Sequence, residues 1–167
     1  GLAVRADRID RAIALLVDHA EAFVEAAAED FGHRSREQTL MTDILPSVSA
    51  LKHARKNMAH WSRGERRKPT FPLGLLGAKA NVAYQPKGVV GIVAPWNFPV
   101  GMVFTPLAGI LAAGNRAMVK PSELTANVSA LMEKIIPDYF DESEVAVFTG
   151  GPEVGISFST LAFDHLI

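Results

Sequence analysis

The turn at residues 94–99 (APWNFP) holds the most unusual chemistry in the chain, because two prolines bracket the amide of Asn97. The turn follows the continuously apolar run 89–94, which is typical of a strand buried on both faces of a parallel sheet. An asparagine amide donates two N–H bonds without losing a proton, which suits the stabilisation of a developing oxyanion. Alternatively, Asn97 satisfies its own turn, and the residue types by themselves favour that structural interpretation.

A second polar turn, at residues 119–123 (VKPSE), follows a short apolar run at 117–119. In dinucleotide folds the end of the second strand meets the adenosine ribose. Lys120 can donate to the ribose hydroxyls and Glu123 can accept from them. Alternatively, Lys120 and Glu123 form an exposed ion pair that contributes little stability.

The other glycine-containing segments give only weak evidence for a nucleotide-binding loop. No G-x-G-x-x-G motif follows the first strand, and no G-x-x-x-x-G-K-[ST] loop occurs. The glycine-rich run at 150–155 (GGPEVG) can bring a helix N-terminus near a pyrophosphate, or can simply turn the chain tightly from strand to helix. No metal site is expected, because His53 and His60 lie two helical turns apart.

The N-terminal third shows helical periodicity. Apolar residues from Ile9 to Ala27 line one helix face, and we expect Asp7 to cap that helix and Gly32 to end it. Residues 35–38 (SREQ) form a capping box for a second helix, in which Pro46 predicts a kink or two abutting helices. Residues 62–79 are interpreted as a solvated linker, followed by a half-exposed strand at 81–85.

Strands and helices alternate after residue 88. Strands are expected at 89–94, 117–119, 145–148 and 165–167, with helices at 100–113, after Thr125 and after residue 151. This order predicts an α/β fold, a doubly wound, Rossmann-like parallel sheet that is incomplete and preceded by a helical segment. Ligands of such sheets bind at the carboxyl ends of the strands, where both polar turns lie. Because a fourth strand starts as the chain stops, we expect the front portion of a longer protein.

Composition excludes several classes of function. The chain has 167 residues, 49% of them hydrophobic, and 17 basic residues nearly cancel 18 acidic ones, so neither a nucleic-acid partner nor a membrane surface is expected. The uncharged run 88–115 contains three prolines, which argues against a membrane span. The chain has no cysteine and no apolar signal segment at its start, which is compatible with a cytoplasmic location.

Taken together, the motifs resemble those of the aldehyde dehydrogenase superfamily. The matching segments are 91–99 (GIVAPWNFP), 112–115 (AAGN), 120–123 (KPSE), Gly151-Pro152 with Gly155, and 163–165 (FDH). The combination is highly specific, although each segment alone is not. The chain resembles the N-terminal portion of the dimeric, class-3-like branch, and as a whole it resembles the bacterial coniferyl aldehyde dehydrogenases.

The resemblance implies a domain organisation. Residues 1–70 would be the helical N-terminal part of the cofactor domain, and residues 71–88 a linker with a strand of the oligomerisation arm. Residues 89–167 would be the first half of the NAD(P)-binding domain, and the catalytic domain would be absent from this chain. A homodimer is implied by the branch resemblance.

The resemblance also implies a reaction and its site residues. A cysteine thiolate would attack a bulky, aromatic aldehyde to give a tetrahedral oxyanion, which Asn97 would hold. Hydride would then pass to the nicotinamide, and a glutamate-activated water would hydrolyse the resulting thioester to the carboxylic acid. The cofactor is expected to be NAD, with NADP accepted less well. The residues expected to bind it are Ala94, Pro95, Trp96, Lys120, Ser122, Glu123, Gly151 and Gly155. The residues expected to line the substrate tunnel are Phe98, Gly101, Met102 and Thr105. Alternatively, Gly101 only allows close helix packing.

The nucleophilic cysteine of that mechanism is absent, so these residues alone are expected to be inactive. A second hypothesis is therefore a non-catalytic nucleotide-binding or assembly module. The two hypotheses differ in the intact mass of the protein, because a stable, monodisperse species near 18.0 kDa would support the module.

Overall fold

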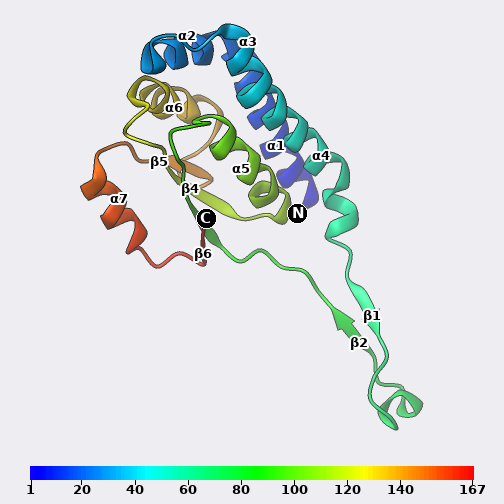
Figure 1. Cartoon of the computed structure of the whole chain (residues 1–167). Coiled ribbons are helices and arrows are strands. Elements are labelled where there is room, and N and C mark those ends of the chain that lie inside the picture. The colour runs from blue at the N-terminus through cyan, green and yellow to red at the C-terminus, as the bar shows by residue number, and fades with distance from the viewer.

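The computed structural model describes residues 1–167 and contains a helical layer, a parallel sheet and a projecting hairpin (Figure 1). The helical segments are α1 (Leu2–Asp18), α2 (Ala20–Phe31), α3 (Arg36–Thr39), η1 (Leu40–Ile44), α4 (Leu45–Trp61), η2 (Leu73–Leu76), α5 (Gly101–Ala113), α6 (Ala126–Tyr139) and α7 (Pro152–Ser159). The strands are β1 (Glu65–Arg67), β2 (Ala80–Val82), β3 (Val89–Val93), β4 (Arg116–Lys120), β5 (Val145–Val147) and β6 (His165–Leu166).

The main sheet has the strand order β5-β4-β3-β6, and all of its pairs are parallel. The chain moves outward from β3 through β4 to β5 and then returns to the other side of β3 to form β6. This confirms the predicted doubly wound α/β fold, including the fourth strand. The reversal between β3 and β6 creates a switch point, and ligands of open α/β sheets bind at the carboxyl ends of strands there.

Helices cover both faces of the sheet, as right-handed crossovers require. Figure 1 shows α5 and α6 on the side that also carries α1 and α4, with α7 on the other side. Gly91 in β3 allows the side chains of Phe163 and Leu166 to pack closely against the strand. A Cβ at this position would lie 2.7 Å from Leu166 Cδ1 and 2.8 Å from Phe163 Cε2, so any larger residue would push the β6 segment away.

The first predicted helix is two helices, because the chain bends at His19, whose φ and ψ are −110° and 15°. The prediction that Asp7 caps the helix is wrong. Asp7 lies inside α1, one turn from Arg11, and accepts a hydrogen bond from its Nε at 2.9 Å. The predicted end at Gly32 is confirmed, since Gly32 adopts the left-handed conformation, with φ 72°.

The second predicted helix begins as the sequence indicates, with the Ser35 hydroxyl accepting a bond from the Gln38 N–H at 3.1 Å. Its expected irregularity near Pro46 is also confirmed. A π-helical turn, η1, joins α3 to α4 in one continuous helical run, in which the Leu45 N–H donates to the Leu40 carbonyl five residues back. Pro46, which has no N–H to donate, follows this wider turn directly.

The interpretation of residues 62–79 as a plain linker is wrong, because β1 lies within it and pairs antiparallel with β2. The two strands form a hairpin that projects from the body of the molecule (Figure 1). Its tip exposes large apolar side chains, namely Phe71, Leu73, Leu75 and Leu76. Sequence reasoning missed β1 because its three residues, Glu65–Arg67, are all charged and lack apolar alternation.

The start of α6 differs in detail from the prediction. Thr125 occupies the N-cap position, but its side chain makes no capping bond. Instead the Asp30 carboxylate, from the end of α2, accepts bonds from the N–H groups of Asn127 at 2.9 Å and Val128 at 3.0 Å. A tertiary contact therefore satisfies the free N–H groups of this helix. No helix in the structure has the length and apolar character needed to cross a membrane.

Candidate active site

The two polar turns start side by side at the carboxyl edge of the sheet. The Ala94 N–H donates to the Lys120 carbonyl at 3.0 Å, which joins the end of β3 to the end of β4. Ala94 is buried, while Pro95, Trp96 and Asn97 are exposed. The structure thus brings the candidate oxyanion donor and the candidate ribose-binding residues to one edge of the sheet, next to the switch point.

The Asn97 side-chain amide makes no hydrogen bond to any other residue of the chain. Only the backbone carbonyl of Asn97 is bonded, and it accepts from Arg34 Nη1 at 3.2 Å. The alternative in which the amide satisfies its own turn therefore finds no support here. Both amide hydrogens are free to donate to a group that enters from solvent.

A buried ion pair stands behind this turn. The side chains of Arg34 and Asp43 are 4% and 1% exposed, and Arg34 Nη2 donates to Asp43 Oδ2. Asp43 Oδ1 accepts from the N–H groups of Val100 at 3.1 Å and Gly101 at 2.7 Å, which cap the start of α5. Burial raises the pKa of Asp43, and the Gly101 N–H and the Arg34 charge oppose that rise.

Sequence reasoning missed Arg34 and Asp43. A signal was present, since Thr39, Asp43 and Ser47 recur every four residues and are all fully buried. Polar residues at helical spacing beside an apolar face indicate a buried polar stripe. The spacing does not show what the stripe faces, and Arg34 lies outside the periodic segment altogether.

Lys120 and Glu123 are close together, as the sequence predicts. Lys120 Nζ donates to the Pro121 carbonyl at 2.8 Å and to Glu123 Oε2 at 3.1 Å. The ion pair of the alternative interpretation therefore forms, with its lysine end buried at 3% exposure and its glutamate end in solvent at 40% exposure. The Glu123 backbone N–H, followed by the Lys120 ammonium group, holds the pKa of the Glu123 carboxyl below its usual value.

The remaining predicted cofactor residues differ in their surroundings. A Cβ at Gly155 would lie 4.0 Å from Lys120 Cε, which places α7 against the lysine stem. Ser122 is buried, and its hydroxyl accepts from the Leu124 N–H at 3.2 Å, so it stabilises the turn itself.

The glycines before α7 turn the chain from β5 into that helix. Gly150 has φ 139°, which supports a tight turn into α7. Gly151 is the N-cap of α7, with the Glu153 carboxylate beside it.

The predicted tunnel residues differ in their exposure to solvent. Phe98 and Met102 are partly exposed next to Asn97. Gly101 is buried, and a Cβ there would lie 3.3 Å from Asp43 Oδ1, so close packing against η1 accounts for this glycine. Thr105 lines a shallow groove between α4 and α5 together with residues such as Pro46 and His53. Thr105 itself is exposed to solvent, so its place in the substrate tunnel stays a prediction.

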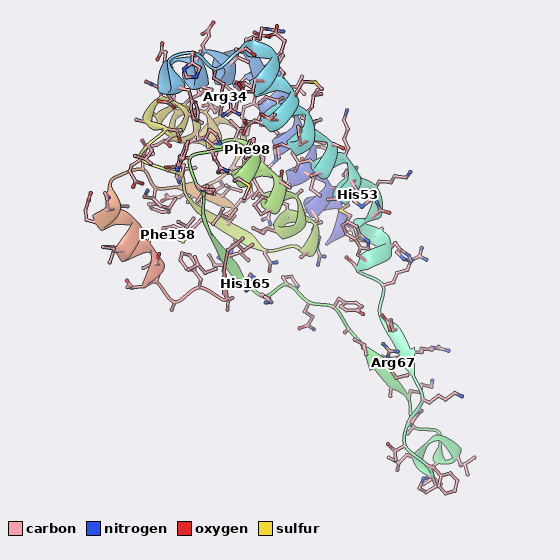
Figure 2. All side chains as sticks on the ribbon, in the orientation of Figure 1. Arg34, His53, Arg67, Phe98, Phe158 and His165 are labelled. Atoms are coloured by element: carbon pink, nitrogen blue, oxygen red, sulfur yellow. The ribbon has the colours of Figure 1, made fainter.

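Figure 2 shows Arg34 and Phe98 near each other where the α2–α3 junction meets the start of α5, and Arg67 far away on the hairpin. The Arg34 guanidinium carbon lies 5.9 Å from the Phe98 ring centre and 4.9 Å from that of Phe31. The Phe31 ring in turn lies 6.4 Å from the Trp96 ring. Trp96 and Phe98, the neighbours of Asn97 in the chain, thus lie close to Phe31 and Arg34 respectively.

The family model described as "Aldehyde dehydrogenase family" matches residues 2–161. The chain belongs to the aldehyde dehydrogenase family. It is 54% identical over 166 residues to a coniferyl aldehyde dehydrogenase of Pseudomonas sp. strain HR199, which covers 99% of this chain and 34% of that relative. It is 33% identical over 151 residues to mouse aldehyde dehydrogenase family 3 member B2, covering 90% of this chain and 31% of that protein. The predicted class-3-like resemblance is confirmed.

Solved structures of the family have the same fold. The substrate-bound Staphylococcus aureus AldH superposes with a TM-score of 0.92 at 30% identity, covering 99% of this chain and 36% of that one. An NAD-dependent benzaldehyde dehydrogenase from Corynebacterium glutamicum gives 0.80 at 25% identity, covering 98% and 35%. The chain therefore spans about a third of the length of the relatives that it matches.

Proposed function

We propose that the protein oxidises an aldehyde to a carboxylic acid with NAD(P)+, and that Asn97 stabilises the oxyanion formed during the reaction. The observation that carries this proposal is the exposed Asn97 amide, free of hydrogen bonds within the chain, at the carboxyl end of β3. A neutral donor held on a proline-bracketed turn can strengthen its bonds as negative charge develops on the carbonyl oxygen. Family membership supports the same reaction.

The geometry of the second turn fits the adenosine ribose of such a cofactor. An ammonium group has three donors, and Lys120 uses two of them on Pro121 and Glu123, which leaves one for a hydroxyl. The Glu123 carboxylate can accept from the same ribose, and it would repel a 2′-phosphate, so NAD is preferred and NADP is accepted less well. When bound, the cofactor accepts hydride. The positions of Ala94, Pro95, Trp96, Gly151 and Gly155 support a role in lining this site.

The thioester step needs a cysteine, and these 167 residues contain none. We propose that the nucleophile belongs to a part of the protein outside this chain, which is consistent with the chain spanning a third of its relatives. The competing hypothesis is a nucleotide-binding or assembly module that does not catalyse. An intact mass near 18.0 kDa for a stable, monodisperse native protein would favour the module, and a mass near three times that value would exclude it.

The substrate proposed is a bulky aromatic aldehyde. Phe98, which follows Asn97, and Met102, one turn further on, are both exposed and offer a flat and an adaptable apolar contact for an aromatic ring. The relative named as a coniferyl aldehyde dehydrogenase supports this choice. A larger kcat/KM for a cinnamaldehyde-type substrate than for acetaldehyde is the expected result.

The projecting hairpin is proposed to be the oligomerisation arm of a homodimer. Its exposed apolar tip supports a role in contact with another surface. The helical residues and the sheet would form the cofactor domain, as the sequence suggests. Because β1 begins at Glu65, the arm in this proposal includes residues that the sequence-based boundary at 70 assigned to the helical part.

The central test is Asn97→Ala in the full-length enzyme. Loss of one oxyanion donor lowers kcat by about 10² to 10³, and the dissociation constant for NAD should stay unchanged. Asn57→Ala, at a half-buried asparagine on α4 whose amide donates to the His53 carbonyl, is the matched control and should behave as the unmodified enzyme. An Asn97→Ala enzyme within about threefold of the unmodified kcat would contradict the oxyanion assignment.

A further inference from the structure

We propose that Arg34 and Asp43 are positioning residues that hold the Asn97 turn in its catalytic geometry, an inference that rests on the proposed function of Asn97. Neither side chain forms a hydrogen bond with the Asn97 amide. Both act on the backbone behind it, where the turn leaves β3 and enters α5.

The turn needs such support because regular structure does not hold it. Ala94 donates to the Lys120 carbonyl, and the Phe98 carbonyl accepts from Met102, but residues 95–97 make no backbone-to-backbone hydrogen bond. The bond from Arg34 Nη1 to the Asn97 carbonyl, at 3.2 Å, is therefore the main-chain anchor of the candidate catalytic residue. A misplacement of the reacting groups by about 1 Å can cost 10²-fold in rate.

The ion pair connects this anchor to the start of α5. Asp43 binds Arg34 with one carboxylate oxygen and the N–H groups of Val100 and Gly101 with the other. One buried pair thus holds the backbone on both sides of Phe98, at residue 97 and at residues 100 and 101. Thr42 adds a further contact, since its hydroxyl accepts from Arg34 Nη2 at 3.0 Å.

Stability alone does not explain this arrangement. A buried ion pair loses the hydration of both charges, and apolar residues of similar volume often give equal or greater stability. Here the charges are 4% and 1% exposed, and Arg34 Nε has no hydrogen-bond partner, so the pair carries a desolvation cost. What apolar residues cannot supply is the set of directed bonds to the turn.

The guanidinium group is specifically suited to this position. Its planar fork reaches the Asn97 carbonyl with one nitrogen and Asp43 with the other, and its carbon lies 4.9 Å from the Phe31 ring centre. A lysine at this position has a single nitrogen and cannot span both partners in the same geometry. Arg34→Lys therefore keeps the buried charge and loosens the turn.

The experiment is a double-mutant cycle in the full-length enzyme, with Arg34→Lys, Asn97→Ala and the combined variant. Arg34→Lys should lower kcat by about 10-fold to 10²-fold, and should leave KM and the NAD dissociation constant within about twofold. In the Asn97→Ala background, Arg34→Lys should change kcat by less than about threefold, because the amide that it positions is gone. Arg36→Lys is the matched control, since Arg36 pairs with Glu21 on the surface two residues away.

Asp43→Asn gives a second test if Arg34→Lys folds poorly. It keeps an acceptor oxygen for Val100 and Gly101 but loses the charge that orients Arg34, so its kcat should also fall, and again only when Asn97 is present. Two results would overturn the positioning role while leaving Asn97 intact: an Arg34→Lys enzyme with unchanged kcat, or losses that multiply in the double variant. An Asn97→Ala enzyme with unchanged kcat would instead overturn the oxyanion proposal and, with it, this inference.

Discussion

Glu144 joins the N-terminal helix to the sheet, and its replacement by glutamine should destabilise the protein at neutral pH. The carboxylate lies just before β5 and accepts from Arg8 Nε at 2.8 Å and from Arg11 Nη1 at 2.8 Å, both on α1. Arg11 also donates to the Tyr139 carbonyl and stacks 4.8 Å from the Phe140 ring centre. Glu144→Gln keeps the shape of the side chain and removes its charge.

The size of the effect follows from the pKa of Glu144. The two arginines lower this pKa from 4.5 to about 2, the hydrogen bond from Arg11 contributing most. One pKa unit corresponds to about 1.4 kcal/mol, so the lowered pKa sets an upper bound of about 3.5 kcal/mol on the contribution to stability. Solvent reaches the edge of this cluster, and we expect the free energy of unfolding to fall by about 1–2 kcal/mol in Glu144→Gln.

The pH dependence has a definite sign. Because the folded pKa is lower than the unfolded pKa, the stabilisation is fully present above about pH 4.5 and is lost as the pH falls towards about 2. Urea unfolding of both proteins at pH 7, 5 and 4 should therefore show a difference in midpoint that shrinks with acidification. Glu21→Gln, in an exposed pair with Arg36, is the control and should change the midpoint little. Equal midpoints at pH 7, or a difference that does not depend on pH, would refute the reasoning.

Two further predictions concern the cofactor and the start of α5. Glu123→Ser should raise kcat/KM for NADP relative to NAD by about tenfold, because it removes the carboxylate proposed to repel a 2′-phosphate and keeps Lys120. A clear preference of the unmodified enzyme for NADP in steady-state kinetics would contradict this assignment. Gly101→Leu should lower the melting temperature rather than alter substrate choice, because a Cβ at Gly101 already lies 3.3 Å from the buried Asp43 carboxylate. A stable Gly101→Leu enzyme with a raised KM only for aromatic aldehydes would contradict this expectation and support the predicted place of Gly101 in the substrate tunnel.

The order of elements could be predicted from the sequence where local rules were sufficient. The apolar run of β3, the glycine that ends α5 and the alternation of strands with helices are local patterns, and they predicted the doubly wound sheet correctly. Capping was predicted well only when the cap was local. Ser35 caps its own helix, whereas α6 is capped by Asp30 from a helix almost 100 residues earlier. No periodicity within α6 contains that information.

The residues of the candidate site also divide into those that local sequence patterns predicted and those that only the tertiary structure revealed. The residue types and spacing in the two turns determined that Asn97, Lys120 and Glu123 would lie at the carboxyl edge of the sheet, because parallel strands end on the same side. Only the tertiary structure showed that the Asn97 amide is unbonded and that Lys120 is buried. Only the tertiary structure brought Arg34 and Asp43 behind the turn, 63 and 57 residues away along the chain from their partners Asn97 and Val100. Sequence spacing encodes which face of an element a residue occupies, and the packing of distant elements decides what that face meets.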